Sequence, residues 1–323
     1  MKKTMNHRDS LLRTARLSGR RLTSESTGKT EGIIFDLDTF AVHDGPGIRM
    51  AVYLKGCGLS CKWCHSPESR RGEPELLFLR ERCAVCGACV SVCKRGVHAV
   101  KDGARVLERA KCAGCGACVA ACAREALRIA GRKVAAEEIV RKAVRLRPFF
   151  SHSDGGVTLT GGEVTAQPGF AEAILAGCRA EGIHTAIETC GAAPWATLKR
   201  LADLSDLILY DIKLIDEREH RRWTGASNRR ILANAKRLAG RNIVIRVPLI
   251  PGITDTEANL RGVFSFMNDA GLSRVSLLPY NPSTGAKYEW VGEECVTEGV
   301  SQTAERMHEI EALASATGAE TQR

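Results

Sequence analysis

The sequence lacks an uninterrupted apolar segment of the length that a signal peptide or a membrane-spanning helix needs. It is also poor in cysteine for a chain cross-linked by disulfides, because 14 cysteines in 323 residues fall below the share typical of disulfide scaffolds. Both absences favour a reducing, cytoplasmic setting and no membrane partner. In such a setting, cysteines that cluster along the chain usually bind metal.

An acidic excess is absent too, and the basic excess is unevenly distributed. The net charge is +10, and residues 1–30 contribute +6 of it, with eight lysines and arginines against two acidic residues. The rest of the chain is only modestly basic, which gives no support for a nucleic-acid partner. We expect residues 1–30 to form a disordered basic extension. The remainder is long enough for one large domain or about two smaller ones.

From Glu31 onward, short β-rich runs alternate with longer amphipathic segments. The runs expected to be strands are "GIIFDLDT", "MAVYLKG", "GVTLTGG", "IHTAIET", "DLILYDIK", "NIVIRVPL" and "RVSLLPYN". The segments expected to be helices include 134–147, 168–181, 195–204, 229–239 and 256–270. Strand and helix in alternation predict an α/β fold with a parallel sheet, which binds ligands at the carboxyl ends of its strands.

Polar residues gather where those strands end. "TGGE" (Thr160–Glu163) ends one strand, Glu188 and Thr189 end the next, and Asp211 and Lys213 end the third. A loop with three cysteines follows "MAVYLKG" in the same way. We therefore expect all four groups to converge on one mouth of the sheet.

Residues 80–128 interrupt the alternation with an internal repeat. "CAVCGACVSVC" and "CAGCGACVAAC" recur at an offset of 29 residues. Four thiolates at C-x2-C-x2-C-x3-C spacing suit a cubane cluster, and the fourth cysteine of each run ligates the cluster of the other run. The spacing predicts a ferredoxin-like module with two clusters. The expected ligands are Cys83, Cys86, Cys89 and Cys122 for one cluster, and Cys112, Cys115, Cys118 and Cys93 for the other.

A pair of structural zinc sites is the alternative for this segment, because four thiolates also suit tetrahedral zinc. Zinc sites more often use two separated C-x2-C pairs and seldom repeat a whole run. The ferredoxin pattern usually ends in Cys-Pro, whereas Lys94 and Ala123 stand at those positions here. Since proline is not a ligand, this difference concerns the rigidity of the loop.

"KGCGLSCKWCH" places Cys57, Cys61 and Cys64 on one short segment. Three thiolates at C-x3-C-x2-C spacing leave one iron of a 4Fe-4S cluster without a protein ligand, so a cosubstrate can bind there. Two alternatives remain at this point: His65 closes the site as a fourth ligand, or the three thiols do not bind metal.

From about residue 31 to 318, the chain resembles the glycyl radical enzyme activating enzymes of the radical S-adenosylmethionine (SAM) superfamily. The resemblance rests on the following motifs and their order: "DGPGIR", "KGCGLSCKWCHSPES", the double ferredoxin insert, "TGGE", "IETCG", "YDIK" and "IPGITD".

The resemblance implies a partial (β/α)6 TIM-like barrel, residues 31–79 and 129–323, with a bacterial-ferredoxin-type insert at 80–128. It implies a cytoplasmic, anaerobic oxidoreductase with three [4Fe-4S] clusters. The open iron is chelated by SAM, whose reductive cleavage gives methionine and a 5'-deoxyadenosyl radical. That radical takes a hydrogen from a backbone glycine of a partner glycyl radical enzyme. A low-potential flavodoxin or ferredoxin is the implied electron donor.

The resemblance also implies which residues contact SAM. Trp63 and His65 lie near the adenine, and Gly162 and Glu163 meet the methionine amino group. Lys213 can face the methionine carboxylate. The full set of expected cofactor-binding residues is Trp63, His65, Gly161, Gly162, Glu163, Glu188, Asp211, Ile212, Lys213 and Asn281.

Two of these positions depart from some relatives, since Asn281 stands where they have histidine and Glu188 where they have aspartate. Glu188 and Asp211 together form a candidate site for a monovalent cation beside the cofactor. Arg246 is expected either to bind cofactor or to form a salt bridge in the mouth. We expect no ligation from Cys178 or Cys295.

Cys190 follows Thr189 near the mouth, so it is either a packing residue, which we favour, or part of the site. Trp223 and Trp290 are expected to serve packing or partner contacts.

Two other classes of function fit part of the pattern. One is a radical SAM enzyme with auxiliary clusters that acts on another peptide or a small molecule. The other is an electron-transfer protein in which every cluster is a relay, but this class leaves "TGGE" and the three-cysteine loop unexplained.

Overall fold

The computed structural model describes residues 30–297 and 299–322. The expected disordered extension, residues 1–30, therefore lies outside the described residues except for Thr30.

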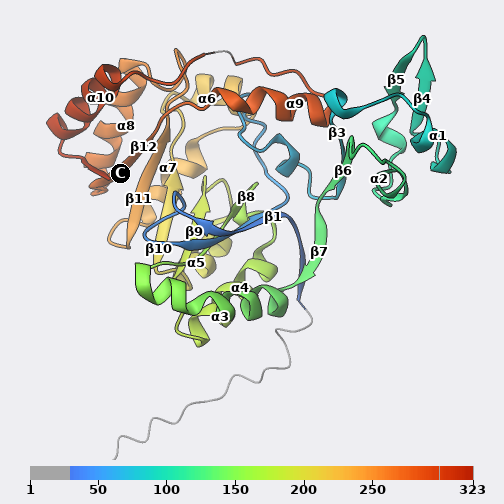
Figure 1. Cartoon of the computed structure of the whole chain (residues 1–323). Coiled ribbons are helices and arrows are strands. Elements are labelled where there is room, and N and C mark those ends of the chain that lie inside the picture. Colours follow the sequence, from blue (N-terminus) through green and yellow to red (C-terminus); the bar gives the residue numbers. More distant parts are fainter. Residues whose placement is uncertain (1–29, 298, 323) are drawn as a thin grey trace, which may run out of the picture.

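A nine-stranded mixed sheet forms the centre of the molecule (Figure 1). Its order is β13-β12-β11-β10-β9-β8-β2-β1-β7, and every pairing from β2 to β13 is parallel. β1 pairs antiparallel with both β2 and β7. The strands are β1 (Glu31–Ala41), β2 (Arg49–Leu54), β7 (Arg132–Ala135), β8 (Gly156–Gly161), β9 (Thr185–Thr189), β10 (Leu207–Asp211), β11 (Ile243–Pro248), β12 (Arg274–Leu278) and β13 (Glu320–Gln322).

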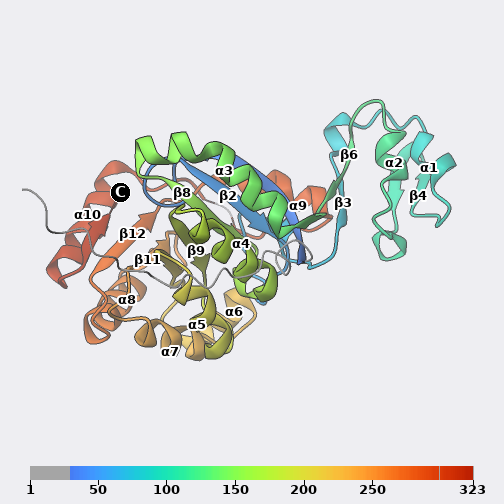
Figure 2. The same ribbon diagram turned by 90° about the horizontal axis from the view of Figure 1, so that it is seen from below.

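Helices connect the parallel strands and lie around the outside of the sheet (Figure 2). They are α3 (Ala136–Ser153), α4 (Pro168–Ala180), α5 (Trp195–Asp203), α6 (Glu217–Thr224), α7 (Arg229–Arg237), α8 (Glu257–Asp269), α9 (Gly285–Val291) and α10 (Ala304–Ala316). α4 shows why such segments form: Pro168 begins it, and Phe170, Ile174 and Cys178 recur on one face and are buried. Each fully buried aliphatic side chain contributes about 1.5–3 kcal/mol.

The two faces of the strands have different roles. On β10, Ile208 and Tyr210 point outward into the main core under the helices. Leu207, Leu209 and Asp211 alternate with them and line an inner cavity. The sheet thus separates an apolar outer layer from an inner cavity, which polar residues line at the carboxyl ends of the strands.

The strand and helix segments expected from the sequence are all present, within about three residues at their ends, except that α3 continues through Pro148 and ends six residues later than expected. The expected ranges did not include α6, α9, α10 or β13. α6 is charged along most of its length, and it buries only His220 and Thr224. Its apolar periodicity is therefore too weak to indicate a helix. The Asp216 side chain caps its first turn by accepting from the Glu219 N–H.

The segment with the cysteine repeat projects from one side of the sheet (Figure 1). β3 (Glu75–Phe78) pairs antiparallel with β6 (Leu127–Ala130) and closes its base. Between them lie the hairpin β4 (His98–Lys101) and β5 (Ala104–Leu107) and two short helices, α1 (Ala88–Val92) and α2 (Ala117–Ala120).

The 29-residue repeat of the sequence also appears in the backbone dihedral angles. Gly87 and Gly116, 29 positions apart, cap α1 and α2 with φ of 79° and 75°. Val85 and Gly114, at the same offset, also have positive φ, at 52° and 65°. Because a branched residue rarely adopts this conformation, Val85 marks a loop shape imposed by its surroundings.

The second cysteine run lies against the rest of the molecule. Arg109 donates to the carbonyl oxygens of Leu76 and, at 2.7 Å, Trp290. A Cβ on Gly114 would lie 3.4 Å from the Pro74 oxygen. The second run is therefore the inner half of the segment.

Candidate functional site

A cavity of about 1430 Å³ opens at the carboxyl ends of the parallel strands. The three-cysteine loop and the polar groups after β8, β9 and β10 all line it, as expected from the sequence. The lining includes Cys57, Cys61, Trp63, Cys64, His65, Gly161, Gly162, Glu163, Glu188, Asp211, Lys213 and Asn281.

Ile212 does not line the cavity. Its side chain is 1% exposed and belongs to the outer core, because the alternation along β10 continues past the end of the strand. Its N–H donates to the Arg246 carbonyl at 3.0 Å. A contact between Ile212 and a cofactor would therefore have to come from its backbone carbonyl.

The three-cysteine loop is held from two sides by backbone hydrogen bonds. On one side, the N–H groups of Gly56 and Cys57 donate to Ser69 and Arg70, at 2.7 and 3.0 Å. On the other side, Ser60 and Lys62 donate to the last carbonyls of α6, at 2.8 and 3.0 Å. These backbone hydrogen bonds hold the loop at both ends independently of metal ligation.

Burial dominates the thiols of this loop. It raises the pKa of Cys57 to about 12 and that of Cys61 to about 11, and it also raises the pKa of Cys64. Thiolates at these positions need a positive partner, which iron supplies. The Leu59 N–H points at the Cys57 Sγ, at 3.4 Å, as it would toward a thiolate. The donor set fits a cluster held by three cysteines.

His65 is close to this loop but differs from the thiols. Its pKa is lowered, first by burial and then by the charge of Lys287. In the described part of the chain, no three His, Cys, Asp or Glu side chains are placed to hold a single metal ion.

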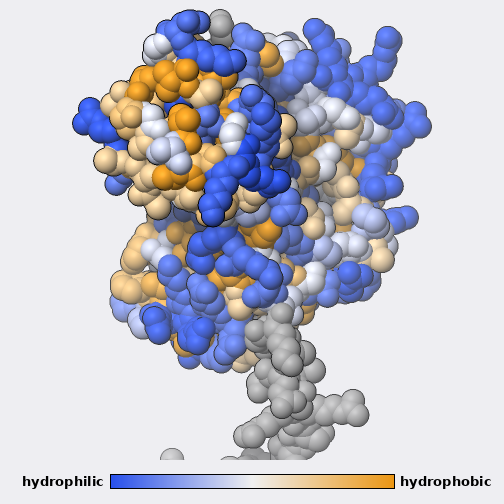
Figure 3. Space-filling model, turned by 90° about the vertical axis from the view of Figure 1, so that its right-hand side faces the viewer, coloured by the Kyte–Doolittle hydropathy of each residue, from blue (hydrophilic) through white to orange (hydrophobic). Residues whose placement is uncertain are grey.

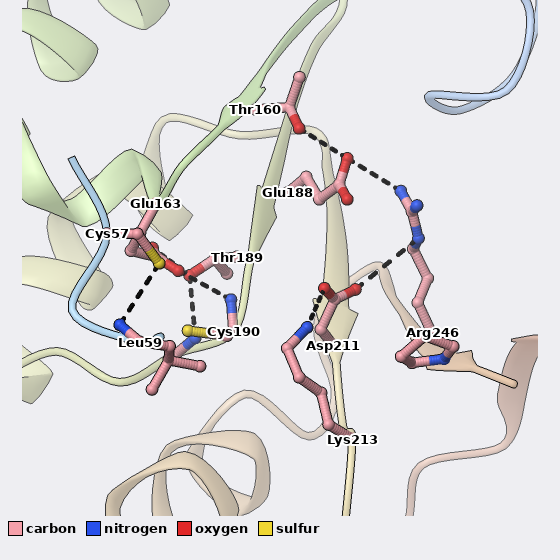
Figure 4. A network of polar contacts seen from close by, with 12 residues as sticks. Cys57, Leu59, Thr160, Glu163, Glu188, Thr189, Cys190, Asp211, Lys213 and Arg246 are labelled. Atoms are coloured by element: carbon pink, nitrogen blue, oxygen red, sulfur yellow. Dashed lines mark hydrogen bonds and ion pairs between the residues drawn. The ribbon is translucent and has the colours of Figure 1, made fainter. Parts of the chain in front are cut away.

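Glu163 is the most constrained polar residue of the cavity (Figure 4). Its Oε1 accepts from Thr165 N, Thr165 Oγ1 and Thr189 Oγ1, at 3.1, 2.8 and 2.6 Å, and its Oε2 accepts from Cys190 N at 2.9 Å. All these donors are neutral, and no ion pair of the described residues includes Glu163. Because the residue is only 5% exposed, its carboxylate is a buried negative charge without a counter-charge.

Four charged residues form a chain across the opposite side of the cavity (Figure 4). Lys213 Nζ lies 2.8 Å from Asp211 Oδ2, and Arg246 lies 3.0 Å from Glu188 Oε2 and 3.8 Å from Asp211 Oδ1. Burial opposes the charge on Lys213, but Asp211, Cys61 and Cys190 together outweigh it and keep the pKa of the lysine raised. Burial raises the pKa of Glu188, while Arg246 opposes that rise.

This chain bears on two expectations. Arg246 forms the salt bridge that was one of its two expected roles. It also lies between the two carboxylates considered as a cation site, so Arg246 and Lys213 already supply positive charge to Glu188 and Asp211. Asp211 Oδ1 is buried and accepts no hydrogen bond, which leaves it available to a ligand donor.

Three cysteines lie outside both the three-cysteine loop and the inserted segment. Cys178 is fully buried in the core, and Cys295 contacts Thr297 at a partly exposed turn. Cys190 is buried beside Cys61 and Trp63, and its backbone N–H holds Glu163. Packing and a turn contact account for Cys178 and Cys295, whereas Cys190 lines the same cavity as the three loop cysteines.

The inserted segment brings seven of its eight cysteines together in two groups, and Cys115, the eighth, is exposed. Cys83, Cys86, Cys89 and Cys122 line one small cavity, which is the set expected for one cluster. Cys118 lies near Cys112 and Cys93, since both act on its pKa after burial. Val97 N–H donates to Cys93 Sγ and Ala126 N–H to Cys122 Sγ, at 3.5 and 3.3 Å, again 29 positions apart.

Unpaired donors complete the fit of this segment to an anionic group. Arg105 lines the cavity of the first cysteine set, and its Nε is buried without a hydrogen-bond partner. Its Nη2 lies 2.5 Å from His98 Nδ1, and His98 Nε2 is likewise buried and unpartnered. Buried donors without acceptors suit the sulfur atoms of a cluster.

Sequence reasoning missed two residues that position the cysteine loop. Tyr288, on α9, donates to the Lys62 carbonyl at 3.0 Å. His220, on α6, lies 2.7 Å from the Ala226 carbonyl. Nothing in the local pattern marks either residue, because each acts through tertiary contacts.

Comparisons with known proteins agree with this geometry. A profile described as the radical SAM superfamily matches residues 109–261, and one described as a 4Fe-4S dicluster domain matches residues 80–127. The chain is 41% identical to the trans-4-hydroxy-L-proline dehydratase activating enzyme of Clostridioides difficile, over 90% of this chain and 98% of that one. It is 37% identical to the isethionate sulfite-lyase activating enzyme of Nitratidesulfovibrio vulgaris, over 92% and 99%. The chain belongs to the glycyl radical enzyme activating enzymes.

A third relative in this family is the choline trimethylamine-lyase activating enzyme of Oleidesulfovibrio alaskensis, with 40% identity over 83% of this chain and 90% of that one. Among solved structures, SuiB of Streptococcus suis bound to its precursor peptide SuiA superposes with a TM-score of 0.51. It is 14% identical and covers 89% of this chain and 50% of that one, so the likeness concerns the fold alone. None of the helices in the described ranges has the length and apolar character needed to span a bilayer.

Proposed function

We propose that this family member activates a partner glycyl radical enzyme by reductive cleavage of SAM. The cleavage yields methionine and a 5'-deoxyadenosyl radical, which removes a hydrogen atom from a backbone glycine of the partner. One observation carries the proposal: the three thiols of the loop, one buried and two partly buried, open into the same cavity as the carboxylate of Glu163, which has no counter-charge among the described residues. A vacant iron position and an anionic pocket are what the amino-acid end of SAM requires.

The fold supports the same proposal. We interpret β2 and β8 to β12 with their helices as a partial (β/α)6 barrel, formed by residues 31–79 and 129–323. Residues 80–128 are then a ferredoxin-type insert. A partial barrel leaves one side of the cavity open, which suits a substrate that is a segment of another protein.

Each residue of the cavity has a distinct task in this proposal. Cys57, Cys61 and Cys64 hold a [4Fe-4S] cluster, which supplies one electron to the SAM sulfonium when bound. Glu163 binds the methionine ammonium, because its carboxylate is fixed by four neutral donors and lacks a cation. Lys213 binds the methionine carboxylate.

We expect the ribose and adenine of SAM to contact Asp211, Trp63 and His65. Asp211 Oδ1 accepts from a ribose hydroxyl, since it is buried and unpartnered. Trp63 and His65 border the adenine. Glu188 and Arg246 keep this wall of the cavity charged and ordered. Gly161 and Gly162 let the end of β8 pack closely on the backbone of Leu54 and Gly56, because Cβ atoms there would collide with it, and this packing positions Glu163.

The insert is proposed to hold two further clusters that relay electrons inward. The outer one uses Cys83, Cys86, Cys89 and Cys122, and the inner one uses Cys112, Cys115, Cys118 and Cys93. A flavodoxin or a ferredoxin in a reducing, anaerobic cytoplasm supplies the electrons.

Anaerobic turnover tests the proposal. The reconstituted protein, reduced with dithionite and given SAM, is expected to form 5'-deoxyadenosine and methionine in equal amounts. Mixed with a glycyl radical enzyme encoded beside its gene, it is expected to produce the doublet of a glycyl radical in the electron paramagnetic resonance (EPR) spectrum. Cleavage without that doublet, together with modification of a different peptide or small molecule, would support the alternative radical SAM function instead.

A further inference from the structure

The inserted segment consists of two halves with the same local structure. β3 and β5 are offset by 29 positions, and β4 and β6 are offset by the same number. The pairs β3–β6 and β4–β5 are both antiparallel, and their registers are equivalent. Each strand residue of one half therefore has a counterpart in the other half. Differences between counterparts are differences between the surroundings of the two cysteine sets.

The halves differ at two positions that face the cysteines. Arg105 on β5 corresponds to Leu76 on β3. His98 on β4 corresponds to Leu127 on β6. Both leucines are buried in the apolar cluster that packs on the cysteines. Arginine and histidine thus stand where the other half has two buried leucines, and placing polar groups at such positions costs stability.

Arg105 carries a positive charge that no carboxylate of the described residues neutralises. Its Nη2 donates to His98 Nδ1 at 2.5 Å, and its Cζ lies 4.3 Å from the centre of the Phe78 ring. Its Nε is buried without a hydrogen-bond partner. The ion pairs among the described residues of the insert join other side chains. Because arginine keeps its charge in proteins, the guanidinium is a fixed cation with neutral neighbours.

This cation lies against one of the two cysteine sets. Arg105 lines a cavity with Val100, its partner across the hairpin, and paired residues of a hairpin point to the same face. The cysteines of that cavity, called the outer set here, are Cys83, Cys86, Cys89 and Cys122. The other run of the repeat contributes most of the inner set, and Leu76 is the counterpart of Arg105 there. The outer set therefore has a cation where the inner set has an apolar side chain.

The surroundings strengthen the effect of this charge. Figure 3 views the molecule from the end of the insert and shows apolar residues gathered on the projecting part, with hydrophilic residues beside them. A charge among apolar groups is less screened than a charge in water. One-electron reduction adds a negative charge to a cluster, so a cation and a free N–H donor beside it favour the reduced form.

We propose that Arg105 holds the cluster of the outer set at a higher reduction potential than the cluster of the inner set. This inference rests on the part of the proposed function that places one cluster on each set. On reduction, the outer cluster takes one electron from the reductant before the inner cluster does, with no bond made or broken. Arg105 does not line the cavity of the three-cysteine loop, so its role is electrostatic and not catalytic.

A redox titration of the reconstituted holoenzyme tests this inference, with dithionite as the reductant and EPR spectra recorded at each potential. The signal of the three-cysteine site is the one absent from Cys61→Ala. The charge variant is Arg105→Leu, because leucine stands at the counterpart position. Arg105→Lys keeps the charge. Arg124→Leu is the control, since it removes an exposed guanidinium that lines the same cavity.

The two insert clusters of the wild-type protein are expected to titrate in two separate steps. Arg105→Leu should lower the higher midpoint potential by about 59 mV or more, which is a tenfold fall in the equilibrium constant of one-electron reduction. The same constant for the other insert cluster should change by less than about twofold. Arg105→Lys and Arg124→Leu should keep both constants within about twofold of the wild type.

A single shared step in the wild type, or equal potentials in the wild type and Arg105→Leu, would overturn the proposal. Zinc or no metal in the insert would overturn it together with the two proposed clusters. Failure of the holoenzyme to cleave SAM would instead refute the proposed function, and the potentials of the insert clusters would still decide the role of Arg105. If Arg105→Leu loses insert iron, Arg105→Gln replaces it with the same expected fall, and loss of insert iron in Arg105→Gln as well overturns the proposal.

Discussion

At the scale of single residues, Glu163 is a buried carboxylate that hydrogen bonds hold in a fixed orientation. Its four hydrogen bonds come from neutral groups on β9 and on the turns that follow β8 and β9, and they fix both oxygens. The carboxylate is thus oriented but not neutralised. A ligand ammonium gains a charge-assisted contact there without the cost of ordering the side chain.

We predict that Glu163→Gln lowers the affinity for SAM about tenfold or more, equivalent to roughly 1.5–3 kcal/mol. The substitution removes the charge and presents an amide N–H to donors, so a lower melting temperature is also expected. Calorimetry with SAM on anaerobic holoenzyme measures the affinity. Thr165→Val is the matched control, because it removes one hydrogen bond to Glu163 and keeps the charge. Equal affinities in wild type and Glu163→Gln would contradict this role.

A second residue, His220, makes the stability of the folded protein depend on pH. Burial lowers its pKa below 6.5, and its Nε2 has no hydrogen-bond partner. As the pH falls below 6.5, the unfolded chain therefore binds a proton at this imidazole before the folded chain does. The free energy of unfolding should fall in that range.

We expect the melting temperature of the anaerobic protein to decrease from about pH 7.5 to about pH 5.5. The decrease should be smaller in His220→Asn, whose amide can keep the hydrogen bond to Ala226 but does not titrate. His308→Asn, at an exposed position, should retain the wild-type decrease. An unchanged decrease in His220→Asn would show that this imidazole does not contribute.

At the scale of elements, the cysteine loop depends on two short helices that the sequence did not indicate. The last carbonyls of α6 accept from Ser60 and Lys62, and Tyr288 of α9 donates to the Lys62 carbonyl. α9 also packs on β3 and on the turn at Pro67–Ser69. The loop is therefore clamped by parts of the chain that lie more than 160 positions away.

We predict that Tyr288→Phe destabilises the loop by about 1 kcal/mol, because a buried carbonyl loses its donor. Iron bound at the three-cysteine site should be lost faster to a chelator, while iron in the insert is retained. Spectra of the two kinds of cluster during chelation measure this. Tyr280→Phe, which removes a bond to Thr297 instead, is the control, and equal loss in both variants would refute the clamp.

The sequence was informative where the chemistry is local. The alternation of strands and helices, the 29-residue repeat and the groups at the ends of β8, β9 and β10 all follow from short-range patterns. The clamp of α6 and α9, the role of Arg246 as a salt bridge and the placement of Ile212 in the core depend on contacts between distant segments. Local periodicity carries no signal for such contacts.

At the scale of the whole molecule, the inserted segment and the nine-stranded sheet with its helices are joined at a few points. β3 and β6 form the base, and Arg109 bridges to Leu76 and Trp290. Gly292 makes room for this bridge, since a Cβ there would lie 2.6 Å from Arg109 Nε. The inner cysteine set is thus held on the barrel side, in the order that an inward relay requires.

The central claim is that Cys57, Cys61 and Cys64 form the site of SAM cleavage and that the insert holds relays. Anaerobic quantitation of 5'-deoxyadenosine with dithionite as reductant, beside the iron content, tests it most directly. The wild-type protein should contain about twelve irons, and Cys61→Ala should lose about four of them and all cleavage. Cys178→Ala, a change of the same kind in the core, should keep both. Cleavage that persists in Cys61→Ala, or zinc in place of iron in the insert, would contradict the account.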